Sequence, residues 1–257
     1  MRLHMSILNT TAAILNLMSQ LKRGITASDV ITHLQLPKST TSRVLKQLCE
    51  TGFLSKDPHS ATYSPALMLL EVAYLAHRTS SLTDDIEQAL RTLCHSTGHT
   101  GYLSVLDGPD VLVLRVIPGR HALQVITYPG TRSPSWATST GRALLSRYSS
   151  QQLLSYFDET LTPENKNQIP FARLQEQLQT VRQQRWSSAI NEAVSGTASI
   201  SCSVKNPQSG ETIAFCLTFP ASMANEQEIE SLARRLTSAA MPIGKKYGDP
   251  YWLQNPL

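Results

Sequence analysis

The chain has 257 residues and carries 23 Lys and Arg against 19 Asp and Glu, a formal charge of +4. This length suffices for one large domain or two ordinary ones with a sizeable buried core. No stretch approaches the roughly 20 apolar residues that a membrane span needs, the N-terminus lacks a signal-peptide pattern, and the four Cys stand far apart without a CxxC pair. We therefore expect a cytoplasmic protein with reduced thiols, no metal site and no cofactor.

The positive charge is concentrated near the N-terminus. Residues 1–66 hold seven Lys and Arg against three Asp and Glu, whereas residues 67–257 hold sixteen of each. A small basic module beside a neutral larger one indicates that the first meets a polyanion. An excess of this size also occurs on ordinary solvated surfaces, so sequence motifs are needed to show whether this module binds nucleic acid.

Three helices and a hairpin are predicted in the first quarter of the chain. Apolar residues between Ile7 and Leu21 fall at helical spacing, and Gly24 is expected to end that helix. Residues 26–29 have the form of a capping box and open a second helix, and Pro37 suits the first turn of a third. Two short strands around the turn KDPHSA complete the pattern of a winged helix-turn-helix, with a plain three-helix packing unit as the alternative.

The third helix, within LPKSTTSRVLKQLCETGFL (residues 36–54), has two contrasting faces. The stripe predicted to face a core consists of Thr41, Val44, Leu45 and Leu48. A shift of two residues, about 200° around the helix, gives an opposite face of short hydroxyls and two cations with no carboxylate. A merely solvated helix face usually mixes Glu with Lys. The predicted DNA contacts are Lys38, Ser39, Thr40, Ser42, Arg43 and Lys46.

Several of these residues also have explanations that do not involve DNA. The hydroxyls of Ser39 and Thr40 could bond their own backbone, and the two lysines could be solvated. A phosphate contact is favoured over a guanine contact for Arg43, because most protein–DNA hydrogen bonds go to the backbone. Lys56 and His59 in the hairpin loop could reach the minor groove or lie there by chance.

The rest of the chain is expected to form a connector and an α+β domain with one mostly antiparallel sheet flanked by helices. Residues 66–76 are apolar nearly all round, so this helix should be buried on several sides or packed against a partner. The next helix begins at Ser81, with Ser81 and Asp84 as its cap, and ends near Gly98. The predicted strands cover residues 102–107, 111–117, 122–127, 198–204 and 212–219, and the predicted helices cover residues 141–148, 151–157, 171–184 and 226–245.

The adjacent Cys94 and His95 invite a catalytic interpretation that the sequence does not support. Neighbouring residues on a helix point about 100° apart, and no orienting Asp or Asn can be placed. Cys94 follows Leu93 and is expected in the core. The chain has no GxSxG, GxGxxG, Walker A or HExxH motif, so no enzymatic activity is predicted.

The chain resembles the IclR family of bacterial transcription regulators over nearly its whole length. The matching segments are LPKSTTSRVLKQLCETGFL, STGHTGYLSVLDG and GTRSPSWATSTGRALLS. The last resembles the family's G-x-x-x-P-x-x-A-T-x-x-G-K-A-x-L signature, and its matching residues are Gly130, Pro134, Ala137, Thr138, Gly141, Arg142, Ala143 and Leu145. This resemblance implies a winged helix-turn-helix over residues 1–65, a linker helix over residues 66–80 and a GAF-like effector-binding domain over residues 81–257.

The resemblance also implies partners and a pocket. It implies homodimers or homotetramers that bind double-stranded operator DNA, and a small-molecule effector, expected to be an organic acid. The implied effector-binding residues are Ser139, Thr140, Gly141, Ser199, Cys216 and Thr218. Helix N-termini attract carboxylates, which suits the start of the helix at Gly141.

The sequence departs from the family's pattern around this implied pocket. Segment 185–192 differs from the usual motif, Ser199 replaces a common Cys, and Trp136 replaces a smaller side chain. We therefore expect no metal binding. The leading hypothesis is an effector-responsive repressor of a catabolic operon, and the alternative is a metabolite-binding or enzymatic GAF-like protein without operator binding.

Overall fold

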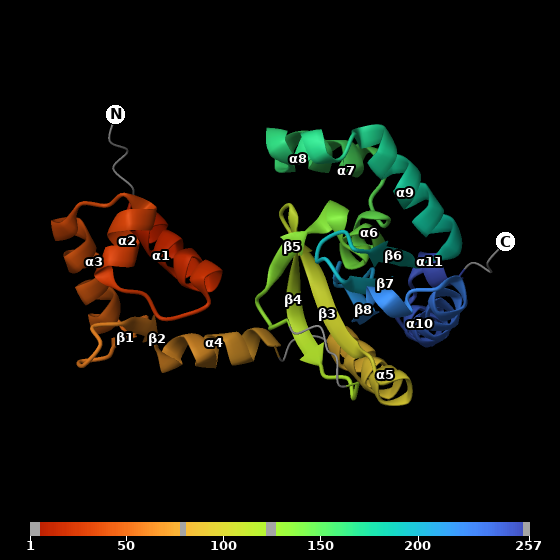
Figure 1. The fold of residues 1–257 in the computed structure, drawn as a ribbon, viewed down its shortest axis with the longest axis horizontal. Coiled ribbons are helices and arrows are strands. Elements are labelled where there is room, and N and C mark those ends of the chain that lie inside the picture. Colours follow the sequence, from red (N-terminus) through yellow and green to blue (C-terminus); the bar gives the residue numbers. More distant parts are fainter. Residues whose placement is uncertain (1–5, 78–80, 122–126, 254–257) are drawn as a thin grey trace. The chain divides into compact units, whose positions relative to one another are not determined.

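The computed structural model describes residues 6–77, 81–121 and 127–253 (Figure 1). The chain divides into two compact units, Met1–Ser80 and Ser81–Leu257. In the described part of the chain, no helix is both long and apolar enough to cross a membrane.

The first unit is a three-helix bundle followed by a hairpin and a further helix. Its elements are α1 (Ile7–Leu21), α2 (Ala27–Leu34), α3 (Lys38–Glu50), β1 (Leu54–Lys56), β2 (Tyr63–Pro65) and α4 (Leu67–His77). The strands β1 and β2 pair antiparallel, and a bridge from Ile25 to Tyr63 ties the hairpin to the chain before α2. This arrangement is a winged helix-turn-helix.

The predicted stripe of α3 faces the core of this unit. Thr41, Val44, Leu45 and Leu48 are its buried residues, as predicted from their spacing. Leu45 packs in one cluster with Ile14 of α1 and Val30 of α2, and all three are fully buried. Burial of each such side chain contributes about 1.5–3 kcal/mol, which fixes which face of α3 remains outside.

Local sequence sets the entry to α2. The capping box is present, because the Thr26 hydroxyl accepts the Asp29 N–H and the Asp29 carboxylate accepts the Thr26 N–H. Arg23 holds that carboxylate with two hydrogen bonds of 3.0 and 2.8 Å. The expectation that Gly24 ends α1 is wrong, because α1 ends at Leu21 with Lys22 in the left-handed region at φ 51°. A side chain at Gly24 would instead lie 2.5 Å from Thr62, so glycine is needed for the close approach of the hairpin.

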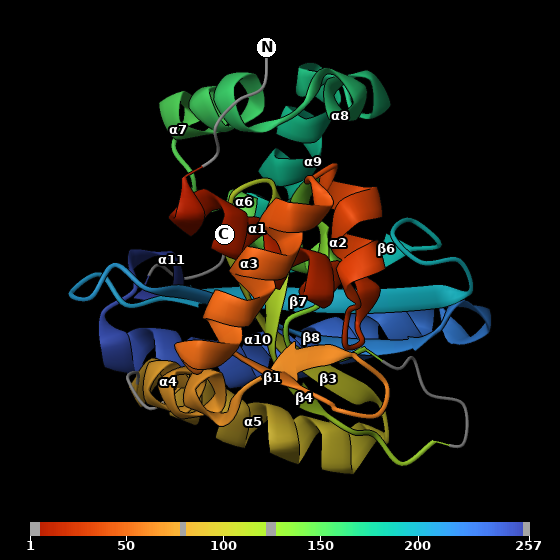
Figure 2. The same ribbon diagram turned by 90° about the vertical axis from the view of Figure 1, so that its left-hand side faces the viewer.

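The second unit is built on one six-stranded antiparallel sheet. Its strand order is β5-β4-β3-β8-β7-β6. The strands are β3 (Thr100–Asp107), β4 (Asp110–Ile117), β5 (Arg132–Pro134), β6 (Ser187–Ile190), β7 (Thr197–Lys205) and β8 (Thr212–Pro220). The helices are α5 (Ser81–Thr97), α6 (Ser139–Leu145), α7 (Ser150–Ser155), α8 (Pro163–Gln168), α9 (Phe171–Gln184), α10 (Glu226–Tyr247) and α11 (Pro250–Leu253). Figure 2 shows α5 and α10 on one side of β7 and β8, and α6 and α9 on the other.

Side chains alternate along β7 and β8, so the helices on the two faces of the sheet contact different sets of residues. The apolar set packs against α5 and α10 and consists of Ile200, Cys202, Val204, Ile213, Phe215, Leu217 and Phe219. Successive strand residues point to opposite faces, so the intervening set lies under α6. That set consists of Ser199, Ser201, Ser203, Ala214, Cys216 and Thr218. One face of the sheet is therefore an ordinary core, and the other is rich in hydroxyls.

Most longer elements match the sequence prediction, and the short ones do not. The bounds of α9 are those predicted, whereas the helix predicted at residues 141–148 begins earlier, at Ser139, and ends at Leu145. The helix predicted at residues 151–157 is divided into α7 and a π-helical turn, Tyr156–Thr160. The elements β5, β6, α8 and α11 were not predicted. The strand predicted at residues 122–127 falls largely outside the described residues.

Candidate functional sites

The outer face of α3 presents exposed polar side chains. Lys38, Ser39, Ser42, Arg43 and Lys46 are exposed, and Thr40 is half-buried. The prediction that this face carries no carboxylate is wrong at its last turn, because Lys46 Nζ lies 3.6 Å from Glu50 Oε1. Both side chains are exposed, by 78% and 62%, so water and a competing anion reach them and the pair contributes little stability.

Arg43 is an exposed cation of this face. Within the described chain, its guanidinium forms no ion pair or hydrogen bond. All five N–H donors of a planar fork are therefore open to a phosphate or to a base edge.

The start of α3 also leaves polar groups available. Pro37 stands at the N-cap and supplies no side-chain hydrogen bond to the helix. The hydroxyls of Ser39 and Thr40 likewise have no partner among the residues that the structure describes. The first turn of α3 therefore keeps both backbone N–H groups and hydroxyls for an external acceptor.

The hairpin loop is ordered by Asp57. Its carboxylate accepts hydrogen bonds from the His59 N–H at 2.9 Å and the Ser60 hydroxyl at 2.6 Å, and these bonds hold the pKa of Asp57 below its usual range. Lys56 lies over the Tyr63 ring at 5.5 Å. His59 itself is exposed at the tip.

The implied effector site lies where the N-terminal end of α6 meets β7. Thr138 caps α6, and its hydroxyl accepts the Gly141 N–H at 3.0 Å. A Cβ at Gly141 would lie 2.0 Å from the Ser135 carbonyl oxygen, so the preceding turn can approach α6 only because this position is glycine. The backbone geometry thus explains the glycine without a ligand.

The side chains of the implied site form a closed cluster of hydrogen bonds. The Ser139 hydroxyl is bonded to Ser199 at 2.7 Å and to Ser201 at 2.6 Å, and Thr140 reaches Ser201 at 3.3 Å. Cys216 Sγ lies 3.7 Å from the Thr218 hydroxyl. The structure thus brings together the six residues named from the resemblance, with Gly141 contributing backbone only. All except Ser199 are buried.

Ser201 belongs to this hydroxyl cluster and was not predicted. It is fully buried and links Ser139 to Thr140. The two-residue alternation of Ser199, Ser201 and Ser203 in β7 was a signal that could have found it. Ser203 extends the same row and donates to the Ala143 carbonyl at 2.7 Å.

The hydroxyl cluster contains no charged group. Burial raises the pKa of the Cys216 thiol, so this sulfur is protonated at neutral pH. Burial likewise raises the pKa of Tyr102, whose strand position pairs with Cys216. An anion here would be met by neutral donors rather than by a fixed cation.

A buried ion pair lies beside the hydroxyl cluster. The side chain of Arg142 is only 4% exposed and forms two hydrogen bonds to Glu192, at 2.6 and 2.8 Å. It also donates to the carbonyls of Trp136 and Ser188. Segment 185–192, which departs from the family's pattern, therefore supplies Glu192 and the Ser188 carbonyl as partners of Arg142.

The structure gives no support to catalysis at Cys94. Cys94 is 2% exposed, and burial raises the pKa of its thiol to about 12. The thiolate is the nucleophilic form of cysteine, so this side chain is inert at neutral pH. Its place is the core between α5 and β3, as the sequence predicted.

Comparison with known proteins identifies both halves of the chain. Residues 10–58 match the IclR helix-turn-helix domain, and residues 75–245 match the C-terminal domain of bacterial transcriptional regulator IclR. The HTH-type transcriptional regulator KipR of Bacillus subtilis is 24% identical over 238 residues, covering 92% of this chain and 94% of that protein. These matches are to transcription regulators and not to enzymes.

Two solved structures show the same fold. An IclR transcriptional regulator from Alicyclobacillus acidocaldarius superposes with a TM-score of 0.78 at 22% identity, covering 93% of this chain and 97% of that one. An IclR homologue from Microbacterium hydrocarbonoxydans, complexed with 4-hydroxybenzoate, gives a TM-score of 0.72 at 20% identity, covering 94% of this chain and 100% of that one.

Proposed function

The chain belongs to the IclR family of bacterial transcriptional regulators, and from this premise we propose that it represses a catabolic operon until a small organic acid binds its second unit. The observation that carries the proposal is the outer face of α3. Its hydroxyls and its free guanidinium stand exposed on a folded winged helix-turn-helix. A recognition helix of this kind enters the major groove with its N-terminal residues at the base edges.

The proposed DNA contacts divide by chemistry. Arg43 reaches a phosphate or the edge of a guanine, and Lys46 and Lys38 supply charge to the phosphate backbone. Ser39, Thr40 and Ser42 are short enough to let the helix approach the groove closely. Lys46 must give up its weak pair with Glu50 on binding, which costs little because both groups are already solvated.

The proposed effector site is the hydroxyl cluster with Gly141. Ser139, Thr140, Ser199, Cys216 and Thr218 supply the side chains, and backbone N–H groups at the start of α6 add donors. Because Thr138 already occupies the Gly141 N–H, hydroxyls carry more of this recognition than the helix terminus does. The complex of the Microbacterium homologue with 4-hydroxybenzoate, an organic acid, supports the chemical class of this effector.

Effector binding must exchange hydrogen bonds within the cluster. A carboxylate that accepts the Ser139 hydroxyl displaces its bond to Ser199 or Ser201, and this loosens the link between α6 and β7. A ligand shifts a two-state equilibrium only through its different affinity for the two states, typically about 1–3 kcal/mol. The exchange offers such a difference.

The proposed domains are a DNA-binding domain over residues 1–65, a linker helix over residues 66–80 and an effector-binding domain over residues 81–257. Division of the chain after Ser80 supports the last boundary. The linker helix α4 exposes Leu67, Leu70 and Val72, by 76%, 67% and 59%. We propose that this apolar surface packs in a homodimer or homotetramer, which would place two recognition helices on operator half-sites about 34 Å apart. The proposed compartment is the cytoplasm.

The test is a salt titration of DNA binding. Fluorescence anisotropy would measure affinity for a labelled duplex from the region upstream of this gene and its neighbours. An operator-binding regulator that contacts several phosphates loses about 10³-fold or more in affinity between roughly 50 and 200 mM salt. Absence of binding to any upstream duplex, or affinity independent of salt, would favour the metabolite-binding protein without operator function.

A further inference from the structure

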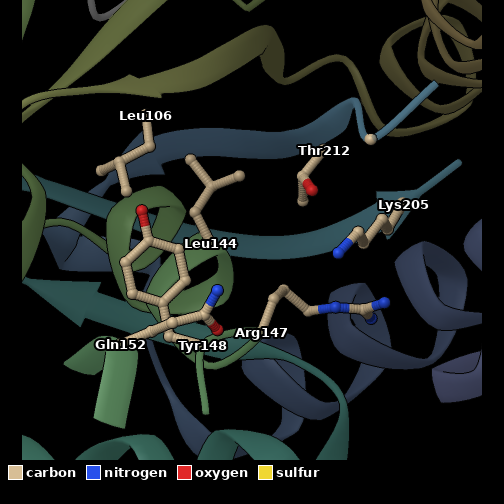
Figure 3. A pocket seen from close by; sticks show the side chains of 8 residues that line it. Leu106, Leu144, Arg147, Tyr148, Gln152, Lys205 and Thr212 are labelled. Carbon is tan, nitrogen blue, oxygen red and sulfur yellow. The ribbon is translucent and has the colours of Figure 1, made fainter. Parts of the chain in front are cut away.

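A pocket of about 310 Å³ opens at the C-terminal end of α6, away from the hydroxyl cluster at its N-terminal end (Figure 3). It is lined on one side by Arg147, Lys205 and Thr212 and on the other by Leu106, Leu144 and Tyr148. Small-molecule sites commonly measure about 300–1,000 Å³, so this volume suits a compact metabolite.

Lys205 places a free cation in this pocket. Alternation along β7 puts Lys205 on the α6 side of the sheet, opposite Thr212 of β8 in the register. In Figure 3 the Lys205 ammonium points into the space between Thr212 and Arg147. Its side chain forms no ion pair with any residue that the structure describes. The charge is therefore available to a ligand.

Arg147 adds a buried donor that lacks an acceptor. Its side chain is 8% exposed, and Nη2 pairs with the fully buried carboxylate of Asp249. Within the described chain the buried Nη1 has no hydrogen-bond partner. A buried donor without a partner costs about 1–3 kcal/mol. The guanidinium lies 4.1 Å over the Tyr251 ring and Nη1 is covered by protein, so a ligand gains this donor only when the Arg147 side chain shifts toward the pocket.

Asp249 does not neutralise the whole pocket. Its single charge is paired with Arg147, and its oxygens also accept the backbone N–H groups of Lys205 at 2.8 Å and Tyr251 at 3.1 Å, so the charge of the Lys205 side chain is left unpaired. A neighbouring hollow of about 530 Å³ shares Arg147 and Lys205 and adds Arg182. Three cations therefore line these two adjoining hollows, and only Arg147 among them is paired with a carboxylate, so the local field favours an anion.

Arg182 offsets the partial negative charge at the C-terminal end of α6, which would otherwise repel an anion. The last carbonyls of a helix carry partial negative charge. Arg182 donates through Nε to the Ser146 carbonyl and through Nη2 to the Tyr148 carbonyl, both at 2.9 Å. These carbonyls are satisfied by a cation instead of facing the pocket unpaired.

We propose that this pocket binds a small organic phosphate, with its phosphate between Lys205, Thr212 and Arg147 and its carbon body against Leu106, Leu144 and Tyr148. An ammonium, a guanidinium donor and a hydroxyl offer more donors than the two oxygens of a carboxylate need, and a lysine is a common point-charge anchor for phosphate. Gln152 lines the same pocket and adds an amide at its rim. This site is separate from the hydroxyl cluster, so the protein binds a second class of metabolite there.

The experiment uses phenyl phosphate as the probe, because it combines a phosphate with a compact apolar ring. Isothermal titration of the full chain should show saturable binding, tighter than inorganic phosphate, with phenol not binding. Lys205→Met should weaken this binding about tenfold or more, since it removes the anchoring charge. Thr212→Val should weaken it less, and both variants should keep the wild-type thermal melt.

Two controls locate the binding. Arg235→Met removes a positive charge from an exposed position of α10 outside the pocket and should leave phenyl phosphate binding unchanged. Thr218→Val alters the hydroxyl cluster and should also leave it unchanged, whatever the fate of the proposed effector site. No binding by the wild-type chain, equal binding by Lys205→Met, or a loss confined to Thr218→Val would each overturn the proposal.

Discussion

The outer face of α3 and the hydroxyl cluster beneath α6 are both rich in short polar side chains, but they differ in what those groups already bond. On α3 the side chains are exposed, and Arg43 has no partner in the described chain. Beneath α6, Ser139 is fully buried and bonded to two serines. The first surface can bind DNA as it stands, whereas the second must exchange internal hydrogen bonds for a ligand. Substitutions on the outer face of α3 should therefore change DNA binding with little change in the free energy of unfolding. Substitutions in the hydroxyl cluster should change both ligand binding and the free energy of unfolding.

The largest stability contrast is expected between two arginines. Arg142→Met removes one partner of a buried ion pair and should lower the free energy of unfolding by about 2–3 kcal/mol, toward the small end for such pairs because the Glu192 side chain is 38% exposed. Arg43→Met removes an exposed charge and should change it by no more than about 0.5 kcal/mol. Urea unfolding followed by circular dichroism measures both, because each unit contains helices, whereas all three Trp lie in the second unit and their fluorescence would not report on the unit that contains Arg43. An equal loss of unfolding free energy in the two variants would show that Arg142 is no more important to the fold than the exposed Arg43.

A smaller contrast is expected between two serines. Ser139→Ala removes the hydroxyl that joins α6 to Ser199 and Ser201 and should cost about 1–2 kcal/mol. Ser39→Ala, on the open face of α3, should leave stability unchanged while it weakens DNA binding. Urea unfolding of the two variants at neutral pH gives the comparison. An unchanged free energy of unfolding in Ser139→Ala would show that the hydrogen bonds of Ser139 do not stabilise the fold.

The smallest effect concerns pH and is also confined to the second unit. His99 is 3% exposed, its Nε2 lies 3.3 Å from Glu228, and its ring is 5.0 Å from that of His121. Burial lowers the pKa of His99, with the Glu228 carboxylate opposing and His121 assisting the shift. The unfolded chain then binds the proton more tightly, so stability is full above about pH 6.5 and falls on acidification.

The measurement is the free energy of unfolding between pH 7.5 and 5.5. One proton contributes a slope of at most about 1.4 kcal/mol per pH unit, and His99→Gln should remove that part of the slope. His33→Gln, at an exposed position of α2, is the matched control and should keep it. An unchanged slope in His99→Gln would assign the acid response elsewhere.

The sequence predicted features set by local periodicity and missed those set by distant partners. The two faces of α3, the capping box of α2 and the bounds of α9 follow from spacing within a few residues. The pairing of Arg142 with Glu192 spans fifty residues and depends on the short strand β6, which exists because β7 offers it an edge. The pair of Lys46 with Glu50 was within reach of the sequence, since it follows the ordinary i,i+4 rule.

The pocket at the far end of α6 shows the same limit. Arg147, Lys205 and Asp249 are far apart in the chain, and only the sheet and the C-terminal turn bring them together. No spacing in the sequence marks them. Ser201, in contrast, could have been included from the alternation of β7 alone.

Operator binding by Arg43→Ala, measured by anisotropy beside a thermal melt of the same sample, tests whether α3 reads DNA. We expect affinity for the operator to fall by about 5- to 150-fold, which corresponds to loss of a contact worth about 1–3 kcal/mol, while the melting temperature stays that of the wild type. Arg235→Ala, at an exposed arginine of α10, should change neither quantity. Full operator affinity in Arg43→Ala would contradict the assignment of α3 as the surface that reads DNA.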